Sequence, residues 1–188
     1  MNGQPAARTD ARPAPRWTER LAEFAPAPPA AAAAWLAEPG LLTERLRACC
    51  EGTTGLRIIT QSEAPLASND AAVLRTTDAA AFVREIELTC DGRPWVFAQT
   101  LVPQATLGRQ RWLGTLGRAA LGERLAAVTG LERGPLEFAR LVPGDGLYHR
   151  ALRECQDPPS TLWARRSWFA IGGDRLLVQE VFLPESHP

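Results

Sequence analysis

The segment Phe82–Pro103 constrains the fold more than any other part of the chain, because it has the pattern of a complete β-hairpin. In its first half, mostly apolar residues alternate with mostly polar ones, so the two sets lie on opposite faces of a strand. The pair Asp91-Gly92 follows and is typical of a tight turn, because glycine readily adopts positive φ. The aromatic and β-branched residues of Trp95–Val102 predict the returning strand, which Pro103 ends.

A second hairpin is predicted near the end of the chain. Strand-like runs at Arg166–Ile171 and Arg175–Leu183 flank Gly172-Gly173-Asp174, a sequence that favours a tight turn. In the returning strand Glu180 shares a face with apolar residues, as Arg84 does in the first hairpin. Opposite charges are therefore expected on the inward faces of two separate hairpins.

These two charges need partners, because an unpaired charge inside a protein costs on the order of several kcal/mol. One interpretation is a buried ion pair between Arg84 and Glu180 that serves only the fold. The other is a polar pocket, in which Arg84 binds a carboxylate through a two-pronged hydrogen bond and Glu180 faces a hydroxyl or acts as an acid or base. A small organic anion with a polar group at its far end fits the second interpretation. The nearby pair Arg165-Arg166 either steers such an anion or is simply solvated.

The remaining segments predict an α+β fold. Helices are expected over Trp17–Phe24, from Pro29 to Glu38, from an N-cap at Thr43 to Gly52, over Gln104–Val128 in two pieces and over Leu147–Cys155, with strands at Gly55–Ser62 and Leu136–Val142 and a loop at Ala64–Ala80. We therefore expect a single antiparallel β-sheet built from hairpins, with helices packed on one face. Residues 1–15, rich in Pro, Ala and Arg, are expected to form a disordered tail, and residues 16–188 a single domain.

Composition argues against several classes of function. The chain carries 21 basic and 21 acidic residues, so nothing points to a nucleic-acid surface. No apolar run approaches the roughly 20 residues needed to cross a bilayer, and the N-terminus lacks the apolar core of a secretory signal. With only two histidines, neither a histidine metal site nor a catalytic triad is expected.

The cysteines, Cys49, Cys50, Cys90 and Cys155, show neither a CxxC pair nor the spacing of a metal site. Two of them, Cys49 and Cys50, lie at helical spacing on the predicted core face of their helix. We expect free, buried thiols in a reducing cytosol.

Several short segments, taken together and in order, resemble the chorismate–pyruvate lyase family, bacterial enzymes that open ubiquinone biosynthesis. The resemblance covers about residues 17–184 and depends on the order and spacing of the segments, since no one of them is decisive. They are Trp35-Leu36 with Leu42-Thr43-Glu44-Arg45-Leu46, Val83-Arg84-Glu85-Ile86 with Cys90-Asp91-Gly92-Arg93-Pro94-Trp95, Leu101-Val102-Pro103, Leu116-Gly117 with Leu121-Gly122, Leu162-Trp163-Ala164-Arg165-Arg166-Ser167, and Glu180-Val181-Phe182-Leu183-Pro184.

The resemblance implies a monomeric, cytoplasmic enzyme that converts chorismate to 4-hydroxybenzoate and pyruvate, the first committed step of ubiquinone biosynthesis, without a metal or cofactor. Family members hold the ligand in an internal cavity under helical flaps, which would retain the 4-hydroxybenzoate product. The family's ligand-contacting arginine and glutamate match Arg84 and Glu180, the expected catalytic residues, and its two backbone contacts match Leu42 and Leu121. Two departures are Leu42, where the family often has Met, and residues 143–161, a segment longer than in the shortest members.

Two rival functions remain open. The effector domains of some bacterial transcription regulators share this fold, bind a small molecule without reacting, and normally follow a winged-helix domain, whereas here only the short tail precedes the fold. The other rival is a silent structural protein, with Arg84 and Glu180 as its internal ion pair. Adding chorismate and looking for 4-hydroxybenzoate and pyruvate separates these possibilities.

Overall fold

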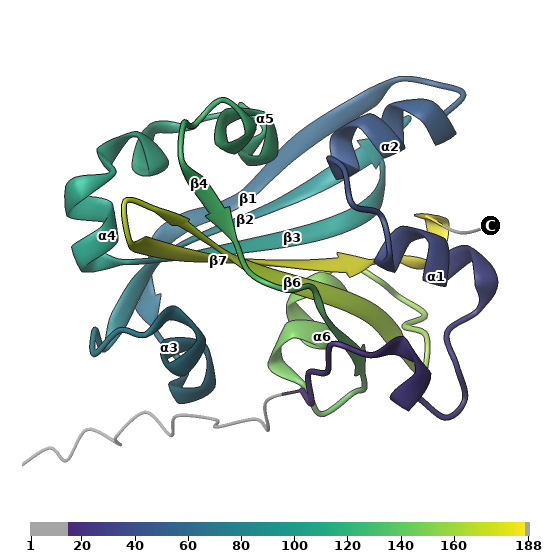
Figure 1. The fold of residues 1–188 in the computed structure, drawn as a ribbon. Coiled ribbons are helices and arrows are strands. Elements are labelled where there is room, and N and C mark those ends of the chain that lie inside the picture. The colour runs from purple at the N-terminus through teal and green to yellow at the C-terminus, as the bar shows by residue number, and fades with distance from the viewer. Residues whose placement is uncertain (1–14, 187–188) are drawn as a thin grey trace, which may run out of the picture.

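The chain folds around a seven-stranded antiparallel sheet, as a computed structural model describes for residues 15–186 (Figure 1). The strand order is β1-β2-β3-β7-β6-β4, and β5 pairs with the other half of β6. The strands are β1 (Thr54–Pro65), β2 (Ala80–Cys90), β3 (Arg93–Pro103), β4 (Leu131–Arg133), β5 (Glu137–Leu141), β6 (Leu162–Ile171) and β7 (Asp174–Phe182). The predicted α+β class is confirmed. Of the predicted tail, residues 1–14 lie outside the described part of the chain.

Short helices complete the fold. The α-helices are α1 (Ala30–Leu36), α2 (Leu42–Cys49), α3 (Ser68–Leu74), α4 (Gln104–Arg109), α5 (Leu121–Ala126) and α6 (Gly146–Ala151), and the 3-10 helices are η1 (Leu21–Glu23), η2 (Arg111–Thr115) and η3 (Pro184–Ser186). Within residues 15–186, none of them is long and apolar enough to cross a membrane.

Both predicted hairpins are present, and each has the turn that its residues favour. Between β2 and β3, Asp91 and Gly92 have φ angles of 47° and 77°, and between β6 and β7, Gly172 and Gly173 have φ angles of 58° and 89°. Positive φ at both central residues is one of the geometries preferred in two-residue hairpin turns. Strands β3 and β7 pair with each other, so the two hairpins form the continuous centre of the sheet.

The register of the strands places the two predicted charges on the same face. Arg84 of β2 lies opposite Thr100 of β3. Two residues away along β3, Ala98 lies opposite Glu180 of β7, which in turn lies opposite Arg165 of β6. Because residues two apart in a strand share a face, all of these side chains belong to one surface of the sheet.

Helices cover both faces of this sheet, in addition to the single face that we expected. Helices α1, α2, α4 and α5 lie over the face that carries Arg84, and α3 and α6 cover the far face (Figure 1). The far face needs a cover because it is also apolar: Phe97 and Val181 pack against α6, and Leu101 and Leu177 against α3. Most of β2 and β3 is buried as a result.

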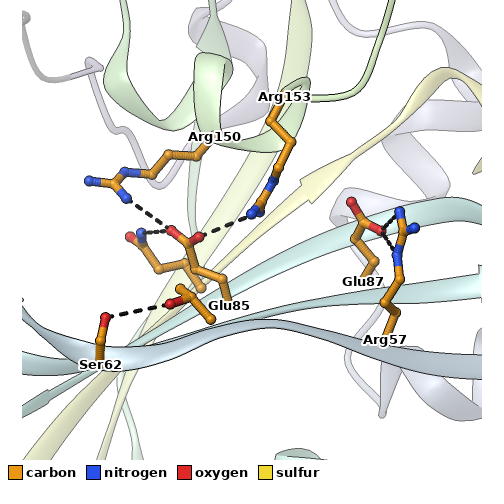
Figure 2. A network of polar contacts seen from close by, with 8 residues as sticks. Arg57, Ser62, Glu85, Glu87, Arg150 and Arg153 are labelled. Carbon is orange, nitrogen blue, oxygen red and sulfur yellow. Dashed lines mark hydrogen bonds and ion pairs between the residues drawn. The ribbon is translucent and has the colours of Figure 1, made fainter.

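Two glutamates of β2 are buried on the far face, where arginines surround them (Figure 2). Glu85 accepts hydrogen bonds from Arg150 of α6 at 3.2 Å and from Arg153, just after this helix, at 3.4 Å. Glu87 accepts one from Nε of Arg57 in β1 at 2.8 Å. Because buried charges persist only when they are paired, these contacts account for acidic residues at the centre of the sheet. They also tie α6 to β2.

Some element boundaries differ from the prediction. The segment expected as a loop contains α3, the edge strand β4 was not expected, and β6 begins at Leu162, well before Arg166. The prediction of Thr43 as an N-cap is wrong, because α2 begins at Leu42 and its N-cap is Leu41, which makes no side-chain cap. Helices this short are stabilised by packing more than by capping or propensity, so their ends are poorly marked in the sequence.

The prediction of free, buried cysteines is wrong. Cys50 and Cys90 form a disulfide with a Cα–Cα distance of 5.8 Å, and Cys49 and Cys155 are exposed. Helix α2 ends at Cys49 and lies over the end of β2, which brings the following residue, Cys50, to the last residue of that strand. The disulfide therefore fastens one end of α2 to the sheet.

Candidate active site

A cavity of about 440 Å³ lies between the sheet and helices α2 and α5. Strands β2, β3, β6 and β7 line one side of it, residues 39–44 and 120–126 line the other, and β4 contributes at the edge. Its volume falls in the range of about 300–1,000 Å³ that small-molecule sites occupy. The structure brings all four predicted site residues, Leu42, Arg84, Leu121 and Glu180, to its wall. Much of the remaining wall is apolar and includes Ile86, Leu88, Leu125, Leu131, Phe169 and Val178.

Arg84 places a buried positive charge on this wall. Its side chain is 2% exposed, and its Nη2 donates hydrogen bonds to the carbonyl oxygens of Gly117 at 3.0 Å and Ala119 at 3.1 Å. The buried Nε has no partner among the described residues, and no carboxylate there pairs with this guanidinium. Burial lowers the pKa of Arg84, but an arginine stays charged at any physiological pH. The charge is therefore solvated only by backbone dipoles and is open to an anion.

Glu180 is held by a different arginine. Nε of Arg165 donates to Oε2 of Glu180 at 2.6 Å, and Nη1 of Arg165 donates to the carbonyl oxygen of Glu38 at 2.5 Å, just after α1. The Glu180 side chain is 21% exposed, and its Oε1 accepts no hydrogen bond from the described residues. The interpretation as an Arg84–Glu180 ion pair is therefore wrong: both charges line the cavity, but each has its own partner.

The two predicted backbone positions occupy equivalent places in two helices. Leu42 is the first residue of α2 and Leu121 the first residue of α5, and both are buried at the cavity. Their N-cap residues, Leu41 and Ala120, make no side-chain hydrogen bond to the helix. The N–H groups of a helix's first turn have no partner within the helix, so both helices present backbone donors near the cavity wall.

Several polar residues of the wall, among them Arg133, Arg165 and Ser167, were not predicted as site residues. Arg165, discussed only as a possible anion guide, is 2% exposed, and Ser167 is buried and donates to the carbonyl oxygen of Gly134 at 2.8 Å. Arg133 donates from Nη1 to the carbonyl oxygen of Pro39 at 3.0 Å. The sequence contains a signal for Arg165: once the strand is extended back to Leu162, Arg165 lies two residues from Ser167 and so shares its inward face.

No group of three or more His, Cys, Asp or Glu side chains in residues 15–186 is placed to hold a metal ion. The chemistry that this wall offers is that of charged and hydrogen-bonding groups. A fixed cation at one place, a fixed carboxylate at another and an apolar lining between them suit a planar organic acid with a polar substituent.

Solved structures share this α+β fold. The effector domain of PhnF from Mycobacterium smegmatis matches 78% of this chain and 90% of its own length, with a TM-score of 0.54 and 18% sequence identity. PhnF itself matches with a TM-score of 0.58 and 17% identity, over 81% of this chain and 67% of its own. At such low identity the likeness shows the fold alone.

Sequence comparison is more specific. A sequence model described as chorismate lyase matches residues 17–187. A probable chorismate pyruvate-lyase of Dechloromonas aromatica is 39% identical over 151 residues, which cover 80% of this chain and 85% of the relative. One of Nitrosospira multiformis is 36% identical over 170 residues, covering 88% and 94%. The chain therefore belongs to the chorismate lyase family.

Proposed function

We propose that this protein is a chorismate pyruvate-lyase, which cleaves chorismate to 4-hydroxybenzoate and pyruvate. The observation that carries the proposal is that, in a member of this family, Arg84 and Glu180 line one largely apolar cavity and do not neutralise each other. We place residues 16–188 in the catalytic domain, as a monomer in the cytoplasm, and the reaction at the first committed step of ubiquinone biosynthesis, as the family resemblance implies.

The proposed reaction balances without an external reagent. Chorismate carries a ring carboxylate, a hydroxyl at ring carbon 4 and an enolpyruvyl ether at ring carbon 3. The bond from carbon 3 to the ether oxygen breaks with its electron pair on the oxygen, and carbon 4 gives up its proton, whose C–H electrons complete the aromatic ring. The enolpyruvate takes up one proton at its methylene carbon and becomes pyruvate. Nothing is oxidised or reduced from outside, and we propose, as the family resemblance implies, that no cofactor or metal takes part.

Each site residue has a proposed role. Arg84 anchors the ring carboxylate, supplying the anion that its own surroundings lack, and backbone N–H groups at Leu42 and Leu121 assist. Glu180 accepts a hydrogen bond from the hydroxyl at carbon 4 and assists the proton that leaves the same carbon. Arg165 keeps the Glu180 carboxylate in place. The site thus contributes mainly position and fixed charge, while aromatisation provides the driving force.

The position of the cavity beneath α2 and α5 has a consequence for turnover. We infer that a flat aromatic acid held by Arg84 beneath α2 and α5 leaves when these covering elements move. We therefore propose that 4-hydroxybenzoate is retained and that its release limits turnover. A stopped-flow measurement of product leaving much faster than turnover contradicts this part of the proposal.

The decisive experiment is an assay with chorismate. Purified protein is mixed with chorismate in the presence of a metal chelator, 4-hydroxybenzoate is measured by chromatography and pyruvate through coupling to lactate dehydrogenase. We expect equal amounts of the two products. Tight binding of 4-hydroxybenzoate without any turnover of chorismate would favour the ligand-sensing alternative, and absence of both binding and turnover would refute a small-molecule role for the cavity.

A further inference from the structure

The cavity wall carries more arginines than the contacts with Glu180 and with one ring carboxylate occupy. Among the residues that the structure describes, its lining includes three arginines, Arg84, Arg133 and Arg165, against two acids, Glu44 and Glu180. Glu180 is paired with Arg165, and Glu44 is exposed. Arg84 has the proposed ring carboxylate as its partner, so Arg133, at the exposed edge of the wall, is left without an acidic partner among the described residues.

The three arginines differ in how far the protein already engages them. Arg165 is bound on one side by Glu180 and on the other by carbonyl oxygens at the end of α1. Arg84 has the proposed ring carboxylate as its partner. Arg133 donates one hydrogen bond, to the carbonyl oxygen of Pro39. Its Cζ lies 5.4 Å from the centre of the Phe169 ring, within the distance of a cation–π contact. Because a guanidinium has several N–H donors, most of those of Arg133 are available to a ligand.

Arg133 also lies on the side of the cavity where Glu180 is found. It is opposite Phe169 in the pairing of β4 with β6, and Phe169 shares the cavity face of β6 with Arg165. Burial, the largest influence, and the charge of Arg165 lower the pKa of Arg133, whereas the charge of Glu180 raises it. Arg133 is therefore within electrostatic reach of the carboxylate that is proposed to meet the hydroxyl at carbon 4.

We propose that Arg133 binds the enolpyruvyl carboxylate of chorismate and so adds to the affinity for the substrate but not to that for 4-hydroxybenzoate; this inference rests on the proposed function. The enolpyruvyl ether is on the ring carbon next to the one that carries the hydroxyl. With the ring carboxylate at Arg84 and the hydroxyl at Glu180, the second carboxylate of the substrate comes near the side chain of Glu180. The second carboxylate of the substrate and the carboxylate of Glu180 repel each other, and Arg133 supplies the cation that offsets this repulsion.

The contact exists only before the reaction. Cleavage of the ether removes the second carboxylate as pyruvate, and 4-hydroxybenzoate keeps only the ring carboxylate at Arg84. Arg133 therefore adds to the affinity for the substrate and not to the retention of the aromatic product. Arg84, in contrast, contributes to the binding of both.

The test compares two stable ligands in wild-type protein and in Arg133→Gln. One ligand is 4-hydroxybenzoate, and the other is 3-(carboxymethoxy)-4-hydroxybenzoate, which carries a second carboxylate on an ether at the same ring carbon as in chorismate. By calorimetry we expect Arg133→Gln to raise the Kd of the dianion on the order of 10- to 100-fold and that of 4-hydroxybenzoate less than about 2-fold. The KM for chorismate should rise with the Kd of the dianion. Arg124→Gln is the matched control, because Arg124 of α5 is exposed and does not line the cavity.

The outcomes are distinguishable. Equal weakening of both ligands, no weakening of the dianion, or the same change in Arg124→Gln overturns the assignment of Arg133. If Arg133→Gln does not fold, Arg133→Lys decides, because retained charge without the forked geometry should weaken the dianion selectively but to a smaller extent. If Arg133→Gln selectively loses affinity for the dianion but the wild-type protein does not cleave chorismate, the lyase function is refuted and the anion site at Arg133 is supported.

Discussion

Replacing Arg84 by methionine should separate the stability of the protein from its affinity for the ligand. The substitution keeps the apolar stem and removes a guanidinium that is 2% exposed and has no carboxylate partner among the described residues. Two backbone carbonyls lose a donor, at about 1 kcal/mol each, while the removal of a buried charge is favourable. We therefore expect the free energy of unfolding to change by no more than about 2 kcal/mol.

Ligand binding should respond far more strongly. The guanidinium of Arg84 is already desolvated before the ligand arrives, so the ligand carboxylate gains most of the energy of two charge-assisted hydrogen bonds, roughly 1.5–3 kcal/mol each. Loss of this contact should raise the Kd of 4-hydroxybenzoate on the order of 10²–10⁴-fold. Arg84→Lys, which keeps the charge without the forked geometry, should give an intermediate Kd.

Calorimetry with a neutral ligand checks the physical reason. In 4-hydroxybenzamide an amide replaces the carboxylate with almost no change of shape, so it has no charge to lose at Arg84. Arg84→Met should therefore affect its binding by only a few-fold. If the variant weakens 4-hydroxybenzoate and 4-hydroxybenzamide by the same factor, Arg84 acts by shaping the cavity, and the argument for a carboxylate anchor is refuted.

Three further predictions concern the groups around this site. Glu180→Gln should lower kcat by about 10²–10⁴-fold with little change in the Kd of 4-hydroxybenzoate, and a variant with wild-type kcat rules out the proton role. Arg165→Lys should lower kcat more than product affinity, because one ammonium cannot hold both Glu180 and the end of α1 in the same geometry. If kcat and product affinity are as low in Arg165→Lys as in Arg165→Ala, a positioning role is contradicted. Reduction of the Cys50–Cys90 disulfide, which closes a separation of 40 residues, should lower the free energy of unfolding by about 2–4 kcal/mol in a denaturant titration, and Cys90→Ser should no longer respond to reductant.

The hairpins and their inward charges were predictable because the information is local. A two-residue turn fixes the register of the strands on either side of it. The turn at Gly172-Gly173 makes Ile171 pair with Asp174, and counting outward from it pairs Arg165 with Glu180. The partner of Glu180 was therefore within reach of the sequence. It was missed because the strand was expected to begin at Arg166, one residue after Arg165, whereas β6 begins at Leu162.

Other features depend on contacts between distant segments, which no local pattern records. The disulfide forms because α2 packs over the end of β2, and the length of the intervening chain does not indicate this. The edge strand β4 is too short to show a period, yet it delivers Arg133 to the cavity. Glu85 and Glu87 alternate with the residues of the cavity face, and nothing local shows that they are buried: α6 brings Arg150 and Arg153 to Glu85, and β1 brings Arg57 to Glu87.

The separate partners of Arg84 and Glu180 explain how two opposite charges on one face can serve a ligand. Had they paired with each other, an anionic ligand would have to break a buried ion pair, which is strongly unfavourable. Instead, the carbonyls of Gly117 and Ala119 orient the cation without neutralising it, and Arg165 holds one oxygen of the carboxylate. A ligand that carries an anion at one end and a hydroxyl at the other can therefore engage both groups without disturbing either partner.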